Sequence, residues 1–242
     1  EFNKAIIDST LDLCCAFKPN LAFYEAMGMD GLRLLERTID YIRQSSPTIM
    51  IIGDAKRGDI GPSGEAYAKA MFDFWNFDAV TINAWGGYDT VEPFISDDRR
   101  GAFIWCRGSN PGSSDLQDLT VESNSNQMLI YEIMAQYAEN WNVKNNLGLV
   151  VGATVTQQLK SVRELCPEQV ILIPGVGAQG GDLSTSVLYG VDDRGRLAII
   201  NSSRGIIYAS QKSDFAQAAR IAASKIKENI NSVLETSGKG WT

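Results

Sequence analysis

Seven short apolar segments, each followed by a segment with helical spacing, constrain the fold of this chain more than any other feature. The expected strands are residues 14–20, 48–56, 79–84, 101–108, 147–154, 170–177 and 197–203. The expected helices are 24–43, 62–74, 88–95, 127–141, 157–165, 183–189 and 215–234, with a short helix over 1–13 ahead of the first strand and a polar loop over 109–125. Regular alternation of strands and helices is typical of a parallel sheet covered by helices.

The number of expected strands helps to distinguish between two kinds of parallel sheet, a closed barrel and an open sheet. A (β/α)8 TIM barrel needs eight strands, and we expect that fold with its first strand upstream of Glu1 or missing from the chain as given. The alternative is a doubly wound open sheet, but its usual glycine fingerprint after the first strand is not present. Because no linker interrupts the alternation, we expect a single domain over residues 1–242.

The net charge, the apolar runs and the cysteines limit the binding partners and the cellular location that we expect for this chain. The 22 Lys and Arg residues against 29 Asp and Glu give a net charge of −7 without a basic run, so binding to nucleic acid or to an anionic membrane surface is not expected. No apolar run is long enough to span a membrane. Four cysteines, Cys14, Cys15, Cys106 and Cys166, lie in or beside apolar segments without CxxC spacing, which indicates reduced, buried thiols and a cytoplasmic location.

The chain contains no histidine. Acid–base chemistry near neutral pH must therefore use Lys, Asp, Glu, Tyr or Cys side chains. Zinc sites built on imidazole and serine–histidine catalysis are both excluded.

The strand at 48–56 runs directly into Asp54, Lys56 and Asp59. Side chains two positions apart point to the same side of a strand, so Asp54 and Lys56 should form a pair in which the lysine is protonated and the carboxylate ionised. Such a pair holds a proton donor beside a fixed negative charge. The alternative is an ion pair that only supports the structure.

Two later segments favour a phosphate site. Four glycines fall between Pro174 and Asp182 ahead of an expected helix, which leaves backbone N–H groups free to approach an anion. Arg204 follows the next strand, and barrels commonly hold phosphate in the loops after their last two strands.

Five motifs together resemble one family. FKPN (17–20), DAKRGDI (54–60), SNPG (109–112), PGVGAQGGD (174–182) and SSRGIIY (202–208), in this order and at this spacing, are similar to the orotidine 5′-phosphate decarboxylases, in particular the branch with longer loops. The resemblance runs over nearly all of residues 2–225. It implies decarboxylation of orotidine 5′-monophosphate (OMP) to uridine 5′-monophosphate (UMP) and CO2 in de novo pyrimidine biosynthesis, with no cofactor and no metal.

The resemblance also implies roles for individual residues. Lys56 would protonate C6 of the pyrimidine, Asp54 would face the departing carboxylate, and Lys18 and Asp59 would complete a Lys-Asp-Lys-Asp network. Substrate binding would fall to Asn20, Ile60, Ser63, Ser109, Pro174, Gln179, Ser203 and Arg204.

Within that set, Ser109 would contact the pyrimidine edge, Gln179 both base and phosphate, and Arg204 the phosphate. The loop after Gln179 is the candidate lid. Asp59 and Ile60 would cross into a partner's site, which implies a homodimer. The sequence leaves open a fusion to orotate phosphoribosyltransferase.

Three positions depart from the family pattern. The first strand of the family usually ends in an Asp that binds the ribose, and no residue here can take that role. Ser63 stands where this branch often has Thr, and its hydroxyl should still make a contact across the dimer. Trp85, in an unusual AWGG segment, is expected to pack in the core.

Two other functions remain open. One is a Mg2+-dependent sugar-phosphate decarboxylase or aldolase on the same barrel, which asks for a further carboxylate where this chain has Asn83. The other is a non-catalytic nucleotide binder, although two carboxylates beside an anionic ligand would gain a binder little.

Overall fold

The computed structural model describes residues 1–123, 126–176 and 182–241 of the chain. Its residues form two compact units. Unit 1 comprises Glu1–Ala102 and Arg204–Lys227, and unit 2 comprises Phe103–Ser203 and Glu228–Thr242. A single domain over the whole chain stays a prediction.

Unit 1 is built on three parallel strands, β1 (Ala16–Phe17), β2 (Met50–Arg57) and β3 (Ala79–Ile82), paired in that order. Ala16 lies opposite Met50, and Ile52 lies opposite Ala79. The register between β2 and β3 shifts between Gly53 and Arg57. The middle of β2 is buried on both faces, as expected for a parallel strand covered by helices.

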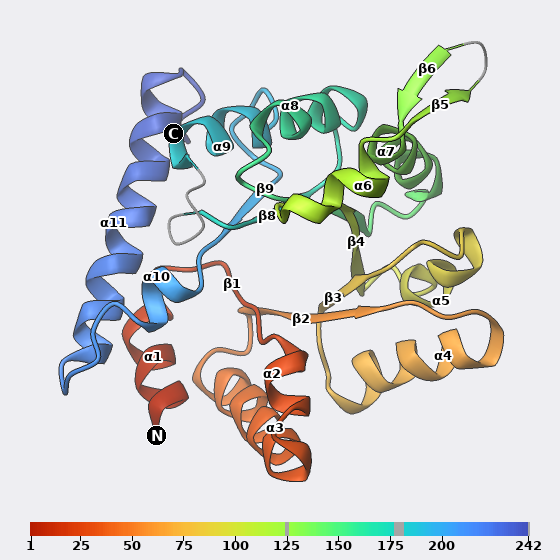
Figure 1. Cartoon of the computed structure of the whole chain (residues 1–242). Coiled ribbons are helices and arrows are strands. Elements are labelled where there is room, and N and C mark those ends of the chain that lie inside the picture. The colour runs from red at the N-terminus through yellow and green to blue at the C-terminus, as the bar shows by residue number, and fades with distance from the viewer. Residues whose placement is uncertain (124–125, 177–181, 242) are drawn as a thin grey trace. The chain divides into compact units, whose positions relative to one another are not determined.

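The helices of unit 1 follow the expected order, and Figure 1 shows α2 and α3 beside β1 and β2. They are α1 (Phe2–Thr10), α2 (Leu21–Glu25), α3 (Gly28–Ser45), α4 (Gly61–Lys69) with the π-helical turn η1 (Ala70–Phe74), the 3-10 turn η2 (Tyr88–Thr90), α5 (Glu92–Ile95) and α10 (Arg204–Ile207). Helix α11 (Phe215–Thr236) begins in unit 1 and ends in unit 2.

The single helix expected over 24–43 is wrong, because the chain forms two helices there. Helix α2 ends at Glu25, and Gly28 adopts a φ of +62° at the start of α3. A left-handed residue interrupts helical hydrogen bonding, and glycine is the residue that adopts it at least cost.

Unit 2 contains most of β4 (Gly101–Arg107) together with β7 (Leu147–Val151), β8 (Ile171–Pro174) and β9 (Ala198–Asn201), in that order. The strands are parallel, with Leu149 opposite Ile171 and Leu172 opposite Ile199. The helical elements are the 3-10 turn η3 (Pro111–Ser113), α6 (Ser114–Gln117), α7 (Ile130–Trp141), α8 (Thr156–Leu165) and α9 (Leu183–Gly190).

The polar loop expected over 109–125 contains regular elements in its described residues, 109–123. It contains η3, α6 and the first strand of an antiparallel hairpin, β5 (Thr120–Ser123) with β6 (Asn126–Leu129), which projects beyond α6 and α7 in Figure 1. Helix α7 consequently begins at Ile130 rather than 127, where the Glu132 side chain accepts a hydrogen bond from the Leu129 amide (3.0 Å).

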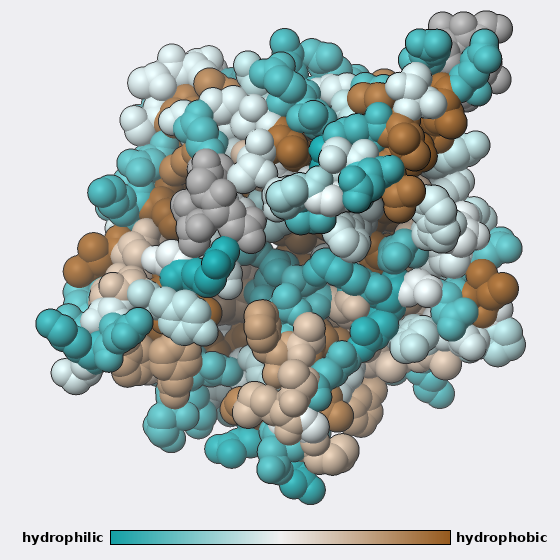
Figure 2. Space-filling model, viewed as in Figure 1, coloured by the Kyte–Doolittle hydropathy of each residue, from teal (hydrophilic) through white to brown (hydrophobic). Residues whose placement is uncertain are grey.

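Apolar side chains remain exposed near this hairpin. Leu116 and Leu119 are 53% and 48% exposed, and Figure 2 shows apolar residues gathered at the base of the hairpin. Composition alone predicts only a polar loop here, and the short strands within it are revealed by the pairing of β5 with β6.

One buried arginine forms hydrogen bonds with several backbone segments of unit 2. Arg163, in the last turn of α8, donates hydrogen bonds to backbone carbonyl groups of Gly190, Leu197, Gln169, Cys166 and Pro167, at distances of 2.6–3.1 Å. Trp241, close to the C-terminus, also packs in unit 2, because its indole donates to Gly195 O at 2.9 Å.

Two of the cysteines behave as expected. Cys106 and Cys166 are buried thiols, whereas Cys15 is exposed. In the described part of the chain, no helix has both the length and the apolar character needed to cross a membrane.

Candidate active site

The segment after β1 brings Lys18 next to the end of β2. Asp54 N donates to Pro19 O at 2.9 Å, and Asn20 pairs with Asp54 as an isolated parallel bridge. The same Asn20 begins α2, because its side-chain oxygen accepts from Ala22 N at 3.1 Å. The FKPN segment is therefore held alongside the carboxyl end of β2.

Two lysines bind the two oxygens of one carboxylate. Lys18 Nζ lies 2.8 Å from Asp54 Oδ2, and Lys56 Nζ lies 2.5 Å from Asp54 Oδ1. The pairing of Asp54 with Lys56 expected from their spacing is therefore present. Asp54 is 8% exposed, whereas the Lys56 side chain is 43% exposed and accessible to a ligand.

The surroundings of Asp54 keep it ionised. Burial raises the pKa of this carboxyl, but the charge of Lys18 and the hydrogen bonds from both lysines outweigh burial and lower the pKa to about 2. At neutral pH the site holds a permanent negative charge between two ammonium groups.

Thr81 on β3 is a site residue that the sequence did not reveal. Its hydroxyl donates to Asp54 Oδ1 (2.9 Å) and accepts from the amides of Ala55 (3.0 Å) and Lys56 (3.1 Å). Thr81 is 2% exposed. The only available signal was a lone polar residue in the apolar segment Ala79–Ile82, which is weak because threonine is common in strands.

Lys56 has an unusual backbone. Its φ of +48° lies in the left-handed region, which is costly for a residue with a side chain. The two amide contacts to Thr81 hold the backbone in this conformation, and the register shift between β2 and β3 falls at the same place. Strain of this kind is typical of residues whose side chain must be aimed.

Asp59, Ile60 and Ser63 lie beyond the network, at the start of α4. All three are exposed, and Asp59 Oδ1 accepts from Ile60 N at 2.8 Å. Within the described residues of this chain, Asp59 forms no ion pair with Lys18 or Lys56. Trp85 is 72% exposed, so the expectation that it packs in the core is wrong.

The other predicted binding residues lie at strand ends. In unit 2, Ser109 follows β4, Pro174 is the last residue of β8, and Ser203 lies after β9. Arg204 begins α10 and is exposed. Gln179, with the candidate lid and most of the glycine-rich loop, lies outside the described residues.

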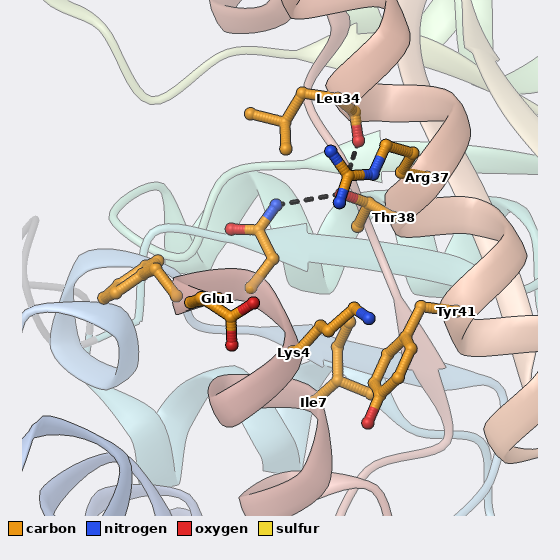
Figure 3. A pocket seen from close by; sticks show the side chains of 9 residues that line it. Glu1, Lys4, Ile7, Leu34, Arg37, Thr38 and Tyr41 are labelled. Atoms are coloured by element: carbon orange, nitrogen blue, oxygen red, sulfur yellow. Dashed lines mark hydrogen bonds between the residues drawn. The ribbon is translucent and has the colours of Figure 1, made fainter.

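A separate pocket lies between α1 and α3 of unit 1 and is shown in Figure 3. Lys4, Arg37 and Tyr41 are among its lining residues. No residue expected in the site lines it, and it contains no ammonium–carboxylate pair comparable to Lys18, Asp54 and Lys56 among its side chains. We therefore place the candidate active site at the ends of β1 and β2.

The comparisons with known proteins agree on one family. The family model described as "Orotidine 5'-phosphate decarboxylase / HUMPS family" matches residues 2–220. An orotidine 5′-phosphate decarboxylase of Dehalococcoides mccartyi is 46% identical over 231 residues, which cover 96% of this chain and 84% of that protein. The enzyme of the same name from Flavobacterium johnsoniae is 42% identical over 236 residues, covering 98% of this chain and 85% of that one.

Solved structures give the same result. The OMP decarboxylase of Leishmania donovani matches 96% of this chain and 86% of its own with a TM-score of 0.85 and 35% identity. The UMP synthase of the same organism matches with a TM-score of 0.87 and 37% identity, and this chain spans 49% of its length. These likenesses confirm the α/β barrel class expected from the sequence, while a strand ahead of residue 1 stays a prediction.

Proposed function

Because this chain belongs to the orotidine 5′-phosphate decarboxylase / HUMPS family, we propose that it decarboxylates OMP to UMP and CO2 without a cofactor or a metal ion. The observation that carries the proposal is the Lys18–Asp54–Lys56 network. The enzyme names of its curated relatives support the same reaction.

In the proposed mechanism Lys56 is the general acid. Loss of CO2 leaves an electron pair on C6 that no carbonyl group is placed to delocalise, and large enzymatic accelerations correspond to as much as ~23 kcal/mol of barrier lowering. A preorganised ammonium group stabilises the developing charge and then donates its proton to C6. The strained backbone of Lys56 supports this role, because it fixes the direction of the side chain.

Asp54 and Lys18 support Lys56 in its role as the general acid. The Asp54 carboxylate would keep Lys56 in place and repel the carboxylate of the substrate. Lys18 occupies the second oxygen of Asp54 and offsets part of the cost of burying that charge. Asp59 would add the second carboxylate of the proposed network.

The binding residues are proposed from the family pattern. Arg204 and Ser203 would hold the phosphate, Ser109 the pyrimidine edge, and Asn20 the ribose or the carboxylates of the network. Pro174 and Gln179 would complete the nucleotide site. A grip on the phosphate supplies binding energy remote from C6, which closure of a lid can use.

We further propose a homodimer in which Asp59, Ile60 and Ser63 reach the partner's site. Large apolar side chains in unit 1 are exposed, as expected of an interaction surface. They include Phe23 (75%), Met27 (58%), Ile60 (59%) and Trp85 (72%), and Figure 2 shows apolar residues over α2. Asp59 also lacks a lysine partner among the described residues of its own chain.

Other parts of the proposal concern cellular context. A cytoplasmic location fits the reduced cysteines, and a single barrel domain fits the extent of the family match. The match to Leishmania donovani UMP synthase keeps open a fusion to a second enzyme domain.

The metal-dependent alternative finds less support. The family description includes HUMPS enzymes, but the curated relatives reported above carry the decarboxylase name.

One assay separates the two activities. We expect the ultraviolet absorbance of OMP to fall when the purified chain is added, at the same rate with and without EDTA. A rate that EDTA abolishes and Mg2+ restores would contradict the metal-free mechanism. No loss of OMP under either condition would contradict the proposed function.

A further inference from the structure

A buried arginine stands at the end of β4, where neither the family motifs nor the proposed mechanism gives it a role. Arg107 is the last residue of β4 and is 4% exposed. Its guanidinium points toward the segment that follows the strand and begins with Gly108 and Ser109. A buried charge is retained in this way only where its partners are well placed.

The guanidinium is fully engaged by that segment. Nε and Nη2 donate to the two oxygens of Asp118 at 3.1 and 2.8 Å, a bidentate pair. Nη1 donates to Gly108 O at 2.6 Å and also to Ser113 Oγ. Residues 108–118 therefore close around one side chain.

Further hydrogen bonds secure the same turn. The Gln117 side-chain oxygen accepts from Gly108 N at 2.8 Å. Ser113 Oγ lies 2.6 Å from Asn110 O, to which it donates. The backbone on both sides of Ser109 is thus fixed by side chains that contact Arg107 or lie beside it.

Strand β7 holds Ser109 from the other side. Gly152 N donates to Arg107 O at 3.0 Å, and a Cβ at Gly152 would lie 2.6 Å from Ser109 Cβ. Only glycine at 152 leaves room for Ser109 in this position. The Thr154 hydroxyl lies 3.5 Å from Ser109 O.

We propose that Arg107, through Asp118 and Gln117, is a positioning residue that preorganises Ser109 to receive the pyrimidine edge of the nucleotide. This inference rests on the proposed function, in which Ser109 contacts the base. A small polar segment loses much conformational freedom when it becomes ordered, and ordering it before binding removes that cost from the ligand. Arg107 would thereby raise the affinity for pyrimidine nucleotides over bare sugar phosphates.

Two ligands separate positioning from general stability. For Arg107→Ala we expect UMP to bind at least about tenfold more weakly, a loss of one well-oriented hydrogen bond or more. The affinity for ribose 5-phosphate should change less than about twofold, because that ligand lacks the base. Calorimetric titration of the folded variants measures both.

A double-mutant cycle tests whether Arg107 influences UMP affinity through Ser109. If Arg107 acts through Ser109, Arg107→Ala should cost little UMP affinity in a Ser109→Ala background. Arg107→Lys should recover only part of the loss, since an ammonium cannot reproduce the forked contact with Asp118. Asp118→Asn and Gln117→Ala serve as milder variants in case Arg107→Ala does not fold.

Arg99→Ala is the matched control, because Arg99 makes an equally bidentate contact with Asp97 (2.9 and 2.8 Å) but is exposed. It should alter neither affinity. Any of three results would overturn the role of Arg107. They are additive losses in the cycle, equal losses of affinity for both ligands, and lowered thermal stability with unchanged UMP affinity. Absence of OMP turnover by the wild-type chain would instead overturn the proposed function.

Discussion

At the scale of single residues, the site depends on the hydroxyl of Thr81, which takes no part in the proposed proton transfer. Thr81 bonds both to the carboxylate of Asp54 and to the amide of Lys56, so it fixes the two charges relative to each other. A hydrogen bond to a charged group contributes about 1.5–3 kcal/mol. Positioning by Thr81 therefore belongs to the account of catalysis as much as the charges do.

We predict that Thr81→Val lowers kcat by roughly ten- to hundredfold, following that hydrogen-bond energy. The KM for OMP should change little, because the variant leaves the proposed phosphate site at Arg204 unchanged, and Thr81→Ser should retain most activity. Thr10→Val is the control, since Thr10 is equally buried but its hydroxyl donates to Ile6 O (2.7 Å) in α1. Wild-type kcat in Thr81→Val would contradict the role.

Asp54 also makes stability depend on pH. Its pKa is lowered from 3.8 to about 2, so its contribution is fully present above pH 4 and is lost as the pH falls toward 2. A shift of this size corresponds to about 2 kcal/mol. In urea unfolding between pH 5 and 2, the wild-type chain should lose more stability than Asp54→Asn.

Asp97 provides the comparison for this pH effect. Its pKa is also lowered to about 2, first by hydrogen bonds from Arg99, but the pair is exposed. Asp97→Asn should therefore follow the wild-type curve closely at physiological salt, because solvent and ions screen surface pairs. Identical curves for wild type and Asp54→Asn would contradict the assignment.

At the scale of elements, the periodicity of apolar residues predicted the order of strands and helices but not their interruptions. The helix expected over 24–43 breaks near Gly28, because the pattern of apolar positions continues across a residue whose backbone is left-handed. The hairpin β5–β6 escaped prediction because its strands pair with each other and four-residue strands carry little pattern.

The site was predicted in part for the same reason. Asp54 and Lys56 share one strand, so their spacing alone brought them together, whereas Thr81 reaches them only through the register of β3 against β2. Arg107 was visible as a strand-end residue, but its partners lie 1 to 11 positions away in a turn that composition does not specify.

The break between α2 and α3 gives an element-scale prediction. Gly28→Ala should destabilise the chain by roughly 1–2 kcal/mol in urea unfolding, the cost of a left-handed residue with a Cβ. No atom lies within 4 Å of the added Cβ, so the cost is conformational only.

Gly31→Ala should cost more than Gly28→Ala. Its Cβ would lie 1.9 Å from Tyr24 O, where α3 approaches α2, so steric overlap adds to the effect. If Gly28→Ala equals the wild type in stability, the left-handed conformation is not required at that position.

At the scale of the whole molecule, sharing of sites between subunits is the decisive question. Asp59 lies outside its own chain's lysine network among the described residues, and two large apolar side chains, Ile60 before α4 and Trp85 after β3, are exposed. A symmetric dimer would make each chain donate Asp59 to the other.

Mixing inactive subunits tests this sharing. Lys56→Ala and Asp59→Ala chains, each with little activity, should regain roughly a quarter of wild-type activity when mixed equally, because half of the dimers would then contain one intact site. Exchange is verified by mass-tagged subunits. If exchange is complete and activity does not return, Asp59 acts within its own chain.

The central claim is that Lys56 delivers the proton to C6, and one variant tests it most directly. In Lys56→Ala, we predict that OMP turnover, followed by absorbance, falls to the limit of detection while UMP binds with an affinity within about tenfold of the wild type. A Lys56→Ala chain that binds UMP and retains wild-type turnover would contradict the account.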